Sequence, residues 1–303
     1  MSFTSRTKDE LSKLEFTNME NISELSAIIQ SNAVITDKIT LITENSSVAR
    51  RIYTLIKKIF NINSKITIRK GYNYSKKLHY ILEINQNVNR VLKTLGIKKE
   101  KPDTFIYADD DLVRAYLKGV FIMCGSINDP KTSRYHLEFN LTNNKYAEFI
   151  SNLLNKYDLN SKVLIRENRY MVYIKEAEKI SDFLRLIGAY NAVLYYEDIR
   201  IYRDHKNMTN RLNNCEQANV EKTIETANNQ LRDIKFLEEK DCFILLNEKE
   251  KEAATYRKKY PEASLVELSE IVSLETGVHI SKSGLYHRFR KIKDLADKIR
   301  NKK

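Results

Sequence analysis

Tryptophan is absent from this 303-residue chain, and glycine, proline and cysteine occur only seven, three and three times. The cysteines, Cys124, Cys215 and Cys242, are odd in number and form no CxxC pair, which argues against a disulfide framework or a zinc site and favours a reducing cytoplasm. The N-terminal residues MSFTSRTKDELSKLE contain no apolar run of secretory or membrane-spanning length. We therefore expect neither a secreted protein nor a membrane protein.

Motifs for common enzyme chemistry are missing as well. The sequence contains no Walker loop, no GxGxxG and no GxSxG. Four histidines have no second histidine or carboxylate at metal-ligand spacing, and we expect them to be structural or exposed: His79, His136, His205 and His279. The sequence therefore predicts neither nucleotide hydrolysis nor nucleophilic catalysis, and no cofactor.

Positive charge is what the chain has in excess. Lys and Arg number 52 against 40 Asp and Glu, a formal net charge of +12, which points to a polyanionic partner. The last 23 residues are the densest cationic segment, with nine Lys or Arg and two Asp. The basic C-terminus is therefore the first candidate for a nucleic-acid contact.

A long internal repeat organises the first two thirds of the chain. The segment LSAIIQSNA, from Leu25, recurs as LKGVFIMCG, from Leu117, and the same offset separates Gly96 from Gly188 in the similar segments VLKTLGI and FLRLIGA. Units of this length are too long for a solenoid repeat and suit a duplicated half-domain. We place the repeats at about 21–97 and 112–190, inside a domain of residues 1–204.

Each repeat is predicted to fold with the element order αββαββα. Apolar residues recur at helical spacing after Asn21 or Ser23, either of which can cap the first helix. Small residues allow the first helices of the two repeats to cross closely, namely Ala27, Ala33, Gly119 and Gly125. The expected fold class is α+β, in which a pseudo-twofold helix pair joins two sheets into a saddle, followed by an all-α domain.

Both nine-residue windows fit the LAGLIDADG helix of homing endonucleases, whose eighth position carries a metal-binding carboxylate. Here that position is Asn32 in one copy and Cys124 in the other. A neutral amide and a soft sulfur are poor ligands for Mg²⁺, which prefers oxygen anions. Glu24 precedes the apolar run of the first helix and Asp129 lies beyond the second motif, so we expect neither to compensate. Cleavage should be lost.

The exposed face of the predicted saddle mixes cations with tyrosines. Such a mixture can contact phosphates and pack on sugars or bases, although it is also compatible with a plain solvated sheet face. The basic residues are Lys65, Arg69, Lys70, Arg134, Lys162, Arg166 and Arg169, interspersed with Tyr72, Tyr74, Tyr135 and Tyr170.

The C-terminal region differs from the repeats in composition and in hydrophobic pattern. Residues 205–219 are polar and are interpreted as a linker loop, and residues 220–303 as a helix-turn-helix domain, with a helix at 248–259, a second from Ser264 to Ser273 and a last one capped by Ser281. Leu285, Phe289 and Ile292 should face the core of this domain.

The last helix is the predicted recognition helix, which would enter the DNA major groove by its first turns. A solvated basic face is the alternative interpretation. Contacts with base edges are predicted for Lys282, Ser283, Tyr286 and His287. Contacts with phosphates are predicted for Arg288, Arg290, Lys291 and Lys293.

Together, the degenerate duplication, the segment NRLNNCEQANVEKT at 210–223 and the terminal SKSGLYHRFRKI from Ser281 resemble the WhiA family of bacterial DNA-binding regulators. The resemblance implies a nuclease-derived domain without cleavage activity, tethered to a helix-turn-helix that binds promoter DNA in the nucleoid. It also implies roles in transcription, cell division, chromosome segregation or sporulation. One departure is Ala33, where a glycine usually closes the motif.

Double-stranded DNA is the implied partner, with other transcription or cell-division proteins as further partners and no membrane association. The oligomeric state stays open. The competing hypothesis is a protein- or RNA-binding scaffold that uses the saddle and has only weak, non-specific affinity for DNA.

Overall fold

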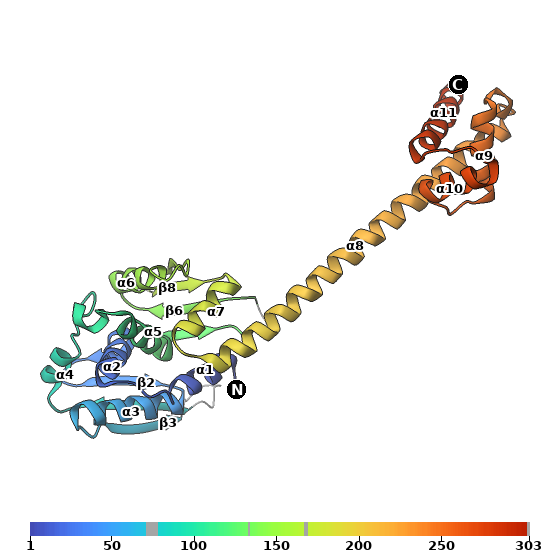
Figure 1. The fold of residues 1–303 in the computed structure, drawn as a ribbon. Helices are drawn as coiled ribbons and strands as arrows, with labels where there is room; N and C mark the ends of the chain where they lie inside the picture. Colours follow the sequence, from blue (N-terminus) through green and yellow to red (C-terminus); the bar gives the residue numbers. More distant parts are fainter. Residues whose placement is uncertain (71–77, 133, 167–168, 302–303) are drawn as a thin grey trace. The chain divides into compact units, whose positions relative to one another are not determined.

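A computed structural model describes residues 1–70, 78–132, 134–166 and 169–301. The chain divides into two compact units, Met1–Asp204 and His205–Lys303 (Figure 1). The first unit is α+β and the second is helical, in agreement with the predicted fold class. Within the described ranges, no helix combines the length and the apolar character that crossing a membrane requires.

The first unit contains the two predicted repeats, preceded by α1 (Phe3–Leu11). The first repeat comprises α2 (Asn18–Asn32), β1 (Val34–Ile35), β2 (Ile39–Thr43), α3 (Ser46–Phe60), β3 (Lys65–Lys70), β4 (Leu78–Ile84) and α4 (Val88–Thr94). The second comprises α5 (Asp110–Cys124), β5 (Gly125–Ile127), β6 (Leu137–Leu141), α6 (Asn144–Asn155), β7 (Lys162–Arg166), β8 (Arg169–Ile174) and α7 (Ala177–Leu186), after the 3-10 helix η1 (Thr104–Tyr107).

The repeats have the same topology, and the predicted order αββαββα is confirmed. Their antiparallel sheets run β1-β2-β4-β3 and β5-β6-β8-β7. Side-chain caps fix the helix starts: Asn45 caps α3, and Asn143 caps α6. The expected start of the first motif helix at Asn21 or Ser23 is wrong, because Thr17 and Glu20 form a capping box one turn earlier.

The two sheets are joined through the crossing of α2 and α5, which lie side by side in Figure 1. The crossing is close because Gly119 has no side chain. A Cβ atom at Gly119 would lie 2.5 Å from the carbonyl oxygen of Glu24 and 2.8 Å from the Cβ of Ala27. The predicted role of the small residues Ala27 and Gly119 is therefore confirmed.

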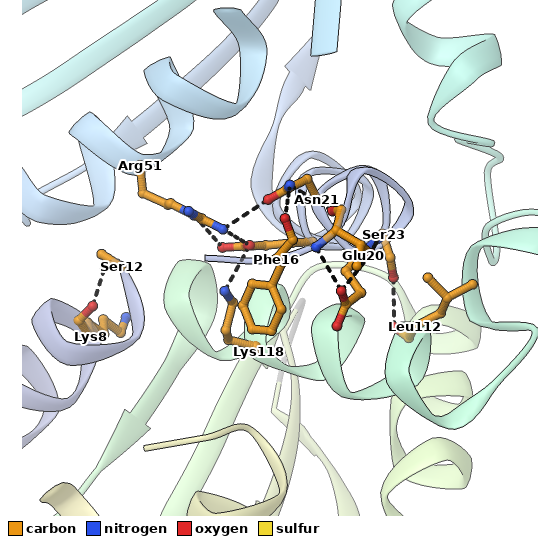
Figure 2. A network of polar contacts seen from close by, with 11 residues as sticks. Lys8, Ser12, Phe16, Glu20, Asn21, Ser23, Arg51, Leu112 and Lys118 are labelled. Carbon is orange, nitrogen blue, oxygen red and sulfur yellow. Dashed lines mark hydrogen bonds and ion pairs between the residues drawn. The ribbon is translucent and has the colours of Figure 1, made fainter. Parts of the chain in front are cut away.

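A buried ionic network lies at the same crossing. Glu24 and Lys118 are both 0% exposed, and the Lys118 ammonium lies 2.8 Å from Glu24 Oε2. Arg51, from α3, donates to the same carboxylate at 2.6 and 3.1 Å. Figure 2 shows Arg51, Lys118 and Phe16 converging on this point, where the Phe16 ring lies 3.8 Å from the ammonium. One anion thus neutralises two cations from different helices.

Burial lowers the pKa of Lys118 to about 8, and the nearby Glu24 carboxylate opposes that shift. The network is costly to assemble, because the charges must leave water. Removing one partner would therefore leave an unpaired charge inside the core.

Helix α1 was not expected from the sequence. Ser2 caps it, and its buried residues Phe3, Thr7 and Leu11 are spaced four apart, a pattern that could have revealed it. Glu10 in turn accepts hydrogen bonds from the backbone amides of Asn191 and Ala192, at 2.8 and 3.1 Å. In this way α1 caps the first turn of the next long helix.

That helix is α8 (Tyr190–Glu239), and it contradicts the linker prediction. Residues 205–219, which we expected to be a polar loop, are helical throughout. The reason is local: residues 190–239 contain neither glycine nor proline, so nothing in this polar stretch interrupts the helix.

The second unit packs the C-terminal turns of α8 against η2 (Phe243–Leu245), α9 (Glu248–Lys259), α10 (Leu265–Thr276) and α11 (Lys282–Arg300). The expected helix at 248–259 is confirmed, and the next helix extends three residues beyond Ser273. Arg257 is buried at the centre, where it donates to Gln230 Oε1 at 2.9 Å and lies 5.5 Å from the Phe289 ring. It connects α8, α9 and α11 within this unit.

The close crossing predicts that Gly119→Ala will destabilise the first unit by about 1 to 3 kcal/mol, because the added methyl meets backbone and a stiff alanine. Chemical denaturation followed by circular dichroism measures the change. Gly284→Ala in α11 is the control: its Cβ would meet only Ser281 Oγ at 3.5 Å and Ile280 Cγ2 at 3.9 Å. That substitution should stabilise the helix by about 0.5 to 1 kcal/mol. Equal effects of the two substitutions would contradict the crossing.

The ionic network predicts that Glu24→Gln will lower the free energy of unfolding by about 3 to 5 kcal/mol, because Arg51 and Lys118 lose their shared buried anion. The exposed Glu15, changed to Gln, is the matched control and should stay within about 0.5 kcal/mol. A thermal or urea transition of Glu24→Gln that coincides with that of the control would refute the role of the network.

Candidate nucleic-acid interface

The ends of α2 and α5 carry the two degenerate motif positions. Asn32 is the last residue of α2 and is exposed. Cys124 ends α5, where its thiol donates to the carbonyl oxygen of Val120 at 3.2 Å, and burial raises the pKa of the thiol to about 12. A neutral amide and a protonated thiol do not suit Mg²⁺, so these positions do not fit the metal of the nuclease fold.

The two flanking carboxylates do not replace the missing ones. Glu24 is enclosed between Arg51 and Lys118 inside the core. Asp129 accepts hydrogen bonds from the Lys131 amide at 2.9 Å and from the Tyr195 hydroxyl at 3.1 Å. Across the ranges that the structure describes, no group of three or more His, Cys, Asp or Glu is placed to hold a metal ion.

The register of the first sheet separates the three basic residues predicted there. Lys65 pairs with Glu83 and Arg69 with His79, so both lie on the outward face of the sheet. Lys70 pairs with Leu78 and belongs to the opposite face, which corrects the expectation of one continuous basic surface. An ion pair between Lys38 and Glu83 also lowers the pKa of the Glu83 carboxyl.

The second sheet carries its cations in a similar arrangement. Lys162 pairs with Tyr173 in the register, and Arg166 pairs with Arg169 at the far end of the same two strands. Lys162 and Arg169 are exposed on the outward face, and Arg134 is exposed just before β6. The two sheets thus each present a pair of cations, Lys65 with Arg69 and Lys162 with Arg169.

The predicted aromatic component of the saddle is largely wrong. Tyr135 packs inward against Tyr196, with 5.7 Å between ring centroids, and Tyr170 faces the core side of its strand. Tyr72 and Tyr74 lie outside the described residues. Tyr173 is the outward tyrosine that the sequence reading missed: its ring stacks on His136 at 5.9 Å. Alternation from Arg169 along β8 could have identified it.

Helix α11 has one buried side and one exposed side. Ser281 caps the helix and accepts a hydrogen bond from the Gly284 amide at 3.1 Å. The predicted core residues Leu285, Phe289 and Ile292 are buried, as is Ala296 one turn later. The opposite side of the helix is therefore free to face a ligand.

Side chains of α10 hold the connection before α11. Gly277 ends α10 in the left-handed region at φ +72°, and residues 277–281 join the two helices. Within this turn, the Ile280 amide donates to Ser273 Oγ at 2.9 Å, which fixes the angle at which α11 starts.

Seven of the eight predicted contact residues are exposed, but Arg288 is not available. Its guanidinium lies 2.6 Å from Glu252 and donates to the carbonyl oxygen of Lys249 at 3.2 Å, both on α9. Lys291 lies 3.8 Å from Glu250 on the same side and remains mostly exposed. The exposed residues are Lys282, Ser283, Tyr286, His287, Arg290, Lys291 and Lys293.

The basic surface of α11 is thereby narrowed to the side away from α9. Lys282, Arg290 and Lys293 have no carboxylate partner among the described residues. The neighbouring α10 exposes carboxylates instead, at Glu267 and Glu270. The exposed charges of α10 and α11 therefore differ in sign.

In comparisons with known proteins, models of a single family match both units. Family models match the WhiA N-terminal LAGLIDADG-like domain over residues 18–98, the WhiA LAGLIDADG-like domain over 113–206 and the WhiA C-terminal HTH domain over 209–296. The chain is 44% identical to the "Probable cell division protein WhiA" of Staphylococcus aureus (strain JH9) over 311 residues, which cover 99% of this chain and 98% of the relative.

Solved structures show the same fold. Full-length WhiA from Thermatoga maritima aligns with a TM-score of 0.60 at 23% identity, covering 98% of this chain and 99% of that one. The N-terminal LAGLIDADG domain of WhiA aligns with a TM-score of 0.51 at 24% identity, covering 62% of this chain and 90% of that domain. With three family models along its length and a relative of this identity, the chain belongs to the WhiA family.

Proposed function

We propose that this protein is a sequence-specific, duplex-DNA-binding regulator of transcription that is linked to cell division, chromosome segregation or sporulation. It would act at the nucleoid in the cytoplasm and would not cleave DNA. The observation that carries the proposal is α11, a capped helix that exposes the unpaired cations Lys282, Arg290 and Lys293 outside its buried stripe. Membership of a family with a C-terminal HTH domain supports it.

The exposed side of α11 has the composition that major-groove recognition requires. Lys282, Ser283 and His287 occupy its first two turns, where they can reach base edges. Arg290 and Lys293 follow on the same exposed side and suit phosphates. Because α10 exposes Glu267 and Glu270, phosphate repulsion favours an approach in which DNA meets α11 first.

The saddle is a second candidate surface. Its cation pairs, Lys65 with Arg69 and Lys162 with Arg169, could add phosphate contacts and raise the effective concentration of α11 at its site.

The α11 assignment predicts different outcomes for two neighbouring arginines. Arg290→Ala should weaken binding to all DNA sequences and flatten the log-log salt dependence by about 0.9 for each lost phosphate contact. Arg288→Ala is the control, because it breaks the pair with Glu252 and should lower the melting temperature more than the salt slope. Fluorescence anisotropy at several salt concentrations, with a melting curve for each variant, measures both.

The same titrations separate base contacts from phosphate contacts. Lys282→Ala or His287→Ala should relax sequence preference, since a lost base contact is worth about 1 to 3 kcal/mol at its own position. If Arg290→Ala, Lys282→Ala and His287→Ala all leave DNA affinity unchanged while the protein stays folded, α11 is not the DNA surface. The scaffold hypothesis would then take precedence.

The motif ends predict that the purified protein will not nick supercoiled plasmid in Mg²⁺ or Mn²⁺, because Asn32 and Cys124 offer no anionic oxygen. Agarose gels over a time course provide the measurement. Nicking that disappears both with a chelator and in Asn32→Ala or Cys124→Ala would show that these positions do support cleavage.

A further inference from the structure

Residues 205–222 of α8 form a continuously helical, polar segment. Every residue in this stretch is exposed. It contains five asparagines, together with His205 and Thr209, all of which favour helix less than alanine does. A helix of this length without tertiary contacts is marginal in water. A partner helix packed against this segment would therefore add to its stability.

Two exposed apolar residues of this segment, Met208 and Leu212, lie on one side of the helix, whereas Val220 lies outside that side. Met208 is 64% exposed and Leu212 is 54% exposed, and Cys215 is exposed one turn further on. With His205 and Asn219, these residues follow each other at alternating intervals of three and four. This is the spacing of the a and d positions of a coiled coil, with Leu212 at a and Met208 and Cys215 at d.

We propose that residues 205–219 form a parallel, two-stranded coiled coil with a second copy of this chain. Asn219 falls at an a position, where an asparagine pairs with its own counterpart and favours two strands in register. Charges beside the seam also agree: Arg211 is at g, and Glu216 is at the following e position of the partner. In a parallel pair these two residues face each other with opposite sign.

Self-association would bring two α11 helices into one particle. Where α11 reads DNA, a dimer matches a site with two related half-sites. That consequence rests on the proposed function, whereas the coiled coil itself does not. We therefore test self-association on the full chain without DNA, so that its failure and a failure of DNA binding can be told apart.

Sedimentation equilibrium of the full chain should show a monomer–dimer equilibrium at micromolar concentration. Leu212→Glu places a charge in the seam and should abolish the dimer. Val220→Glu is the matched control: Val220 is an exposed apolar residue of the same helix, but it lies outside the seam, and its change should leave the dimer intact. Hydrogen exchange of residues 205–222 should slow as protein concentration rises, because pairing stabilises the helix.

Cys215 reports the register directly. In a parallel pair the two Cys215 thiols lie side by side, so diamide should oxidise them to a disulfide by accepting two electrons and two protons. A covalent dimer should appear on a non-reducing gel, persist in Cys242→Ser and vanish in Cys215→Ser.

Three results would overturn the proposal: a monomer at all concentrations, a dimer that Leu212→Glu leaves unchanged, or a dimer in which Cys215 does not cross-link. The first would return residues 205–222 to a marginal helix. The other two would place the interface elsewhere or in another orientation.

Discussion

In the first unit α2 and α5 cross closely, and the arrangement of both sheets depends on this crossing. Gly119 lets the backbone of α5 come within reach of the carbonyl oxygen of Glu24. At the same crossing, Glu24 neutralises Lys118 and Arg51, so that α2, α3 and α5 share one buried carboxylate. Close packing and the buried ion pairs therefore stabilise the same helix crossing. A shift of either helix would open a gap in the packing and leave a buried charge without its partner.

This crossing also shows what became of a nuclease motif. The small residues of the motif are kept where two helices meet, as Ala27 and Gly119 are. The positions that would hold a metal have become Asn32 and the half-buried Cys124 at the end of α5. The fold needs the close helix pair for its stability, whereas it does not need the carboxylates. A scaffold of this kind can thus remain folded without those carboxylates.

In the second unit, ion pairs decide which part of a basic helix faces outward. Arg288 and Lys291 have similar charge to Arg290 and Lys293, yet Glu252 and Glu250 on α9 occupy the first two. The remaining cations lie on a narrower side of α11, and the neighbouring α10 exposes carboxylates at Glu267 and Glu270. The unpaired positive charge of this unit therefore lies on one side of α11. Packing against α9, rather than composition, determines which side that is.

The sequence by itself determined the duplicated αββαββα order, the helix at 248–259, the cap at Ser281 and the inward residues of α11, because repeats, caps and periodicity are local signals. Membership of the family also followed from the combination of motifs.

Other features depended on the tertiary structure. The separation of Lys70 from Lys65 and Arg69 required the strand register, and the loss of Arg288 required a partner 36 residues away in the chain. The burial of Glu24 required two other helices, and the polar stretch 205–219 became helix because nothing interrupts it, although its composition favours a loop. Sequence patterns indicate which local element a segment forms, but they do not indicate which charged side chains pair between elements. Those ion pairs determined which cations of this protein are exposed and unpaired.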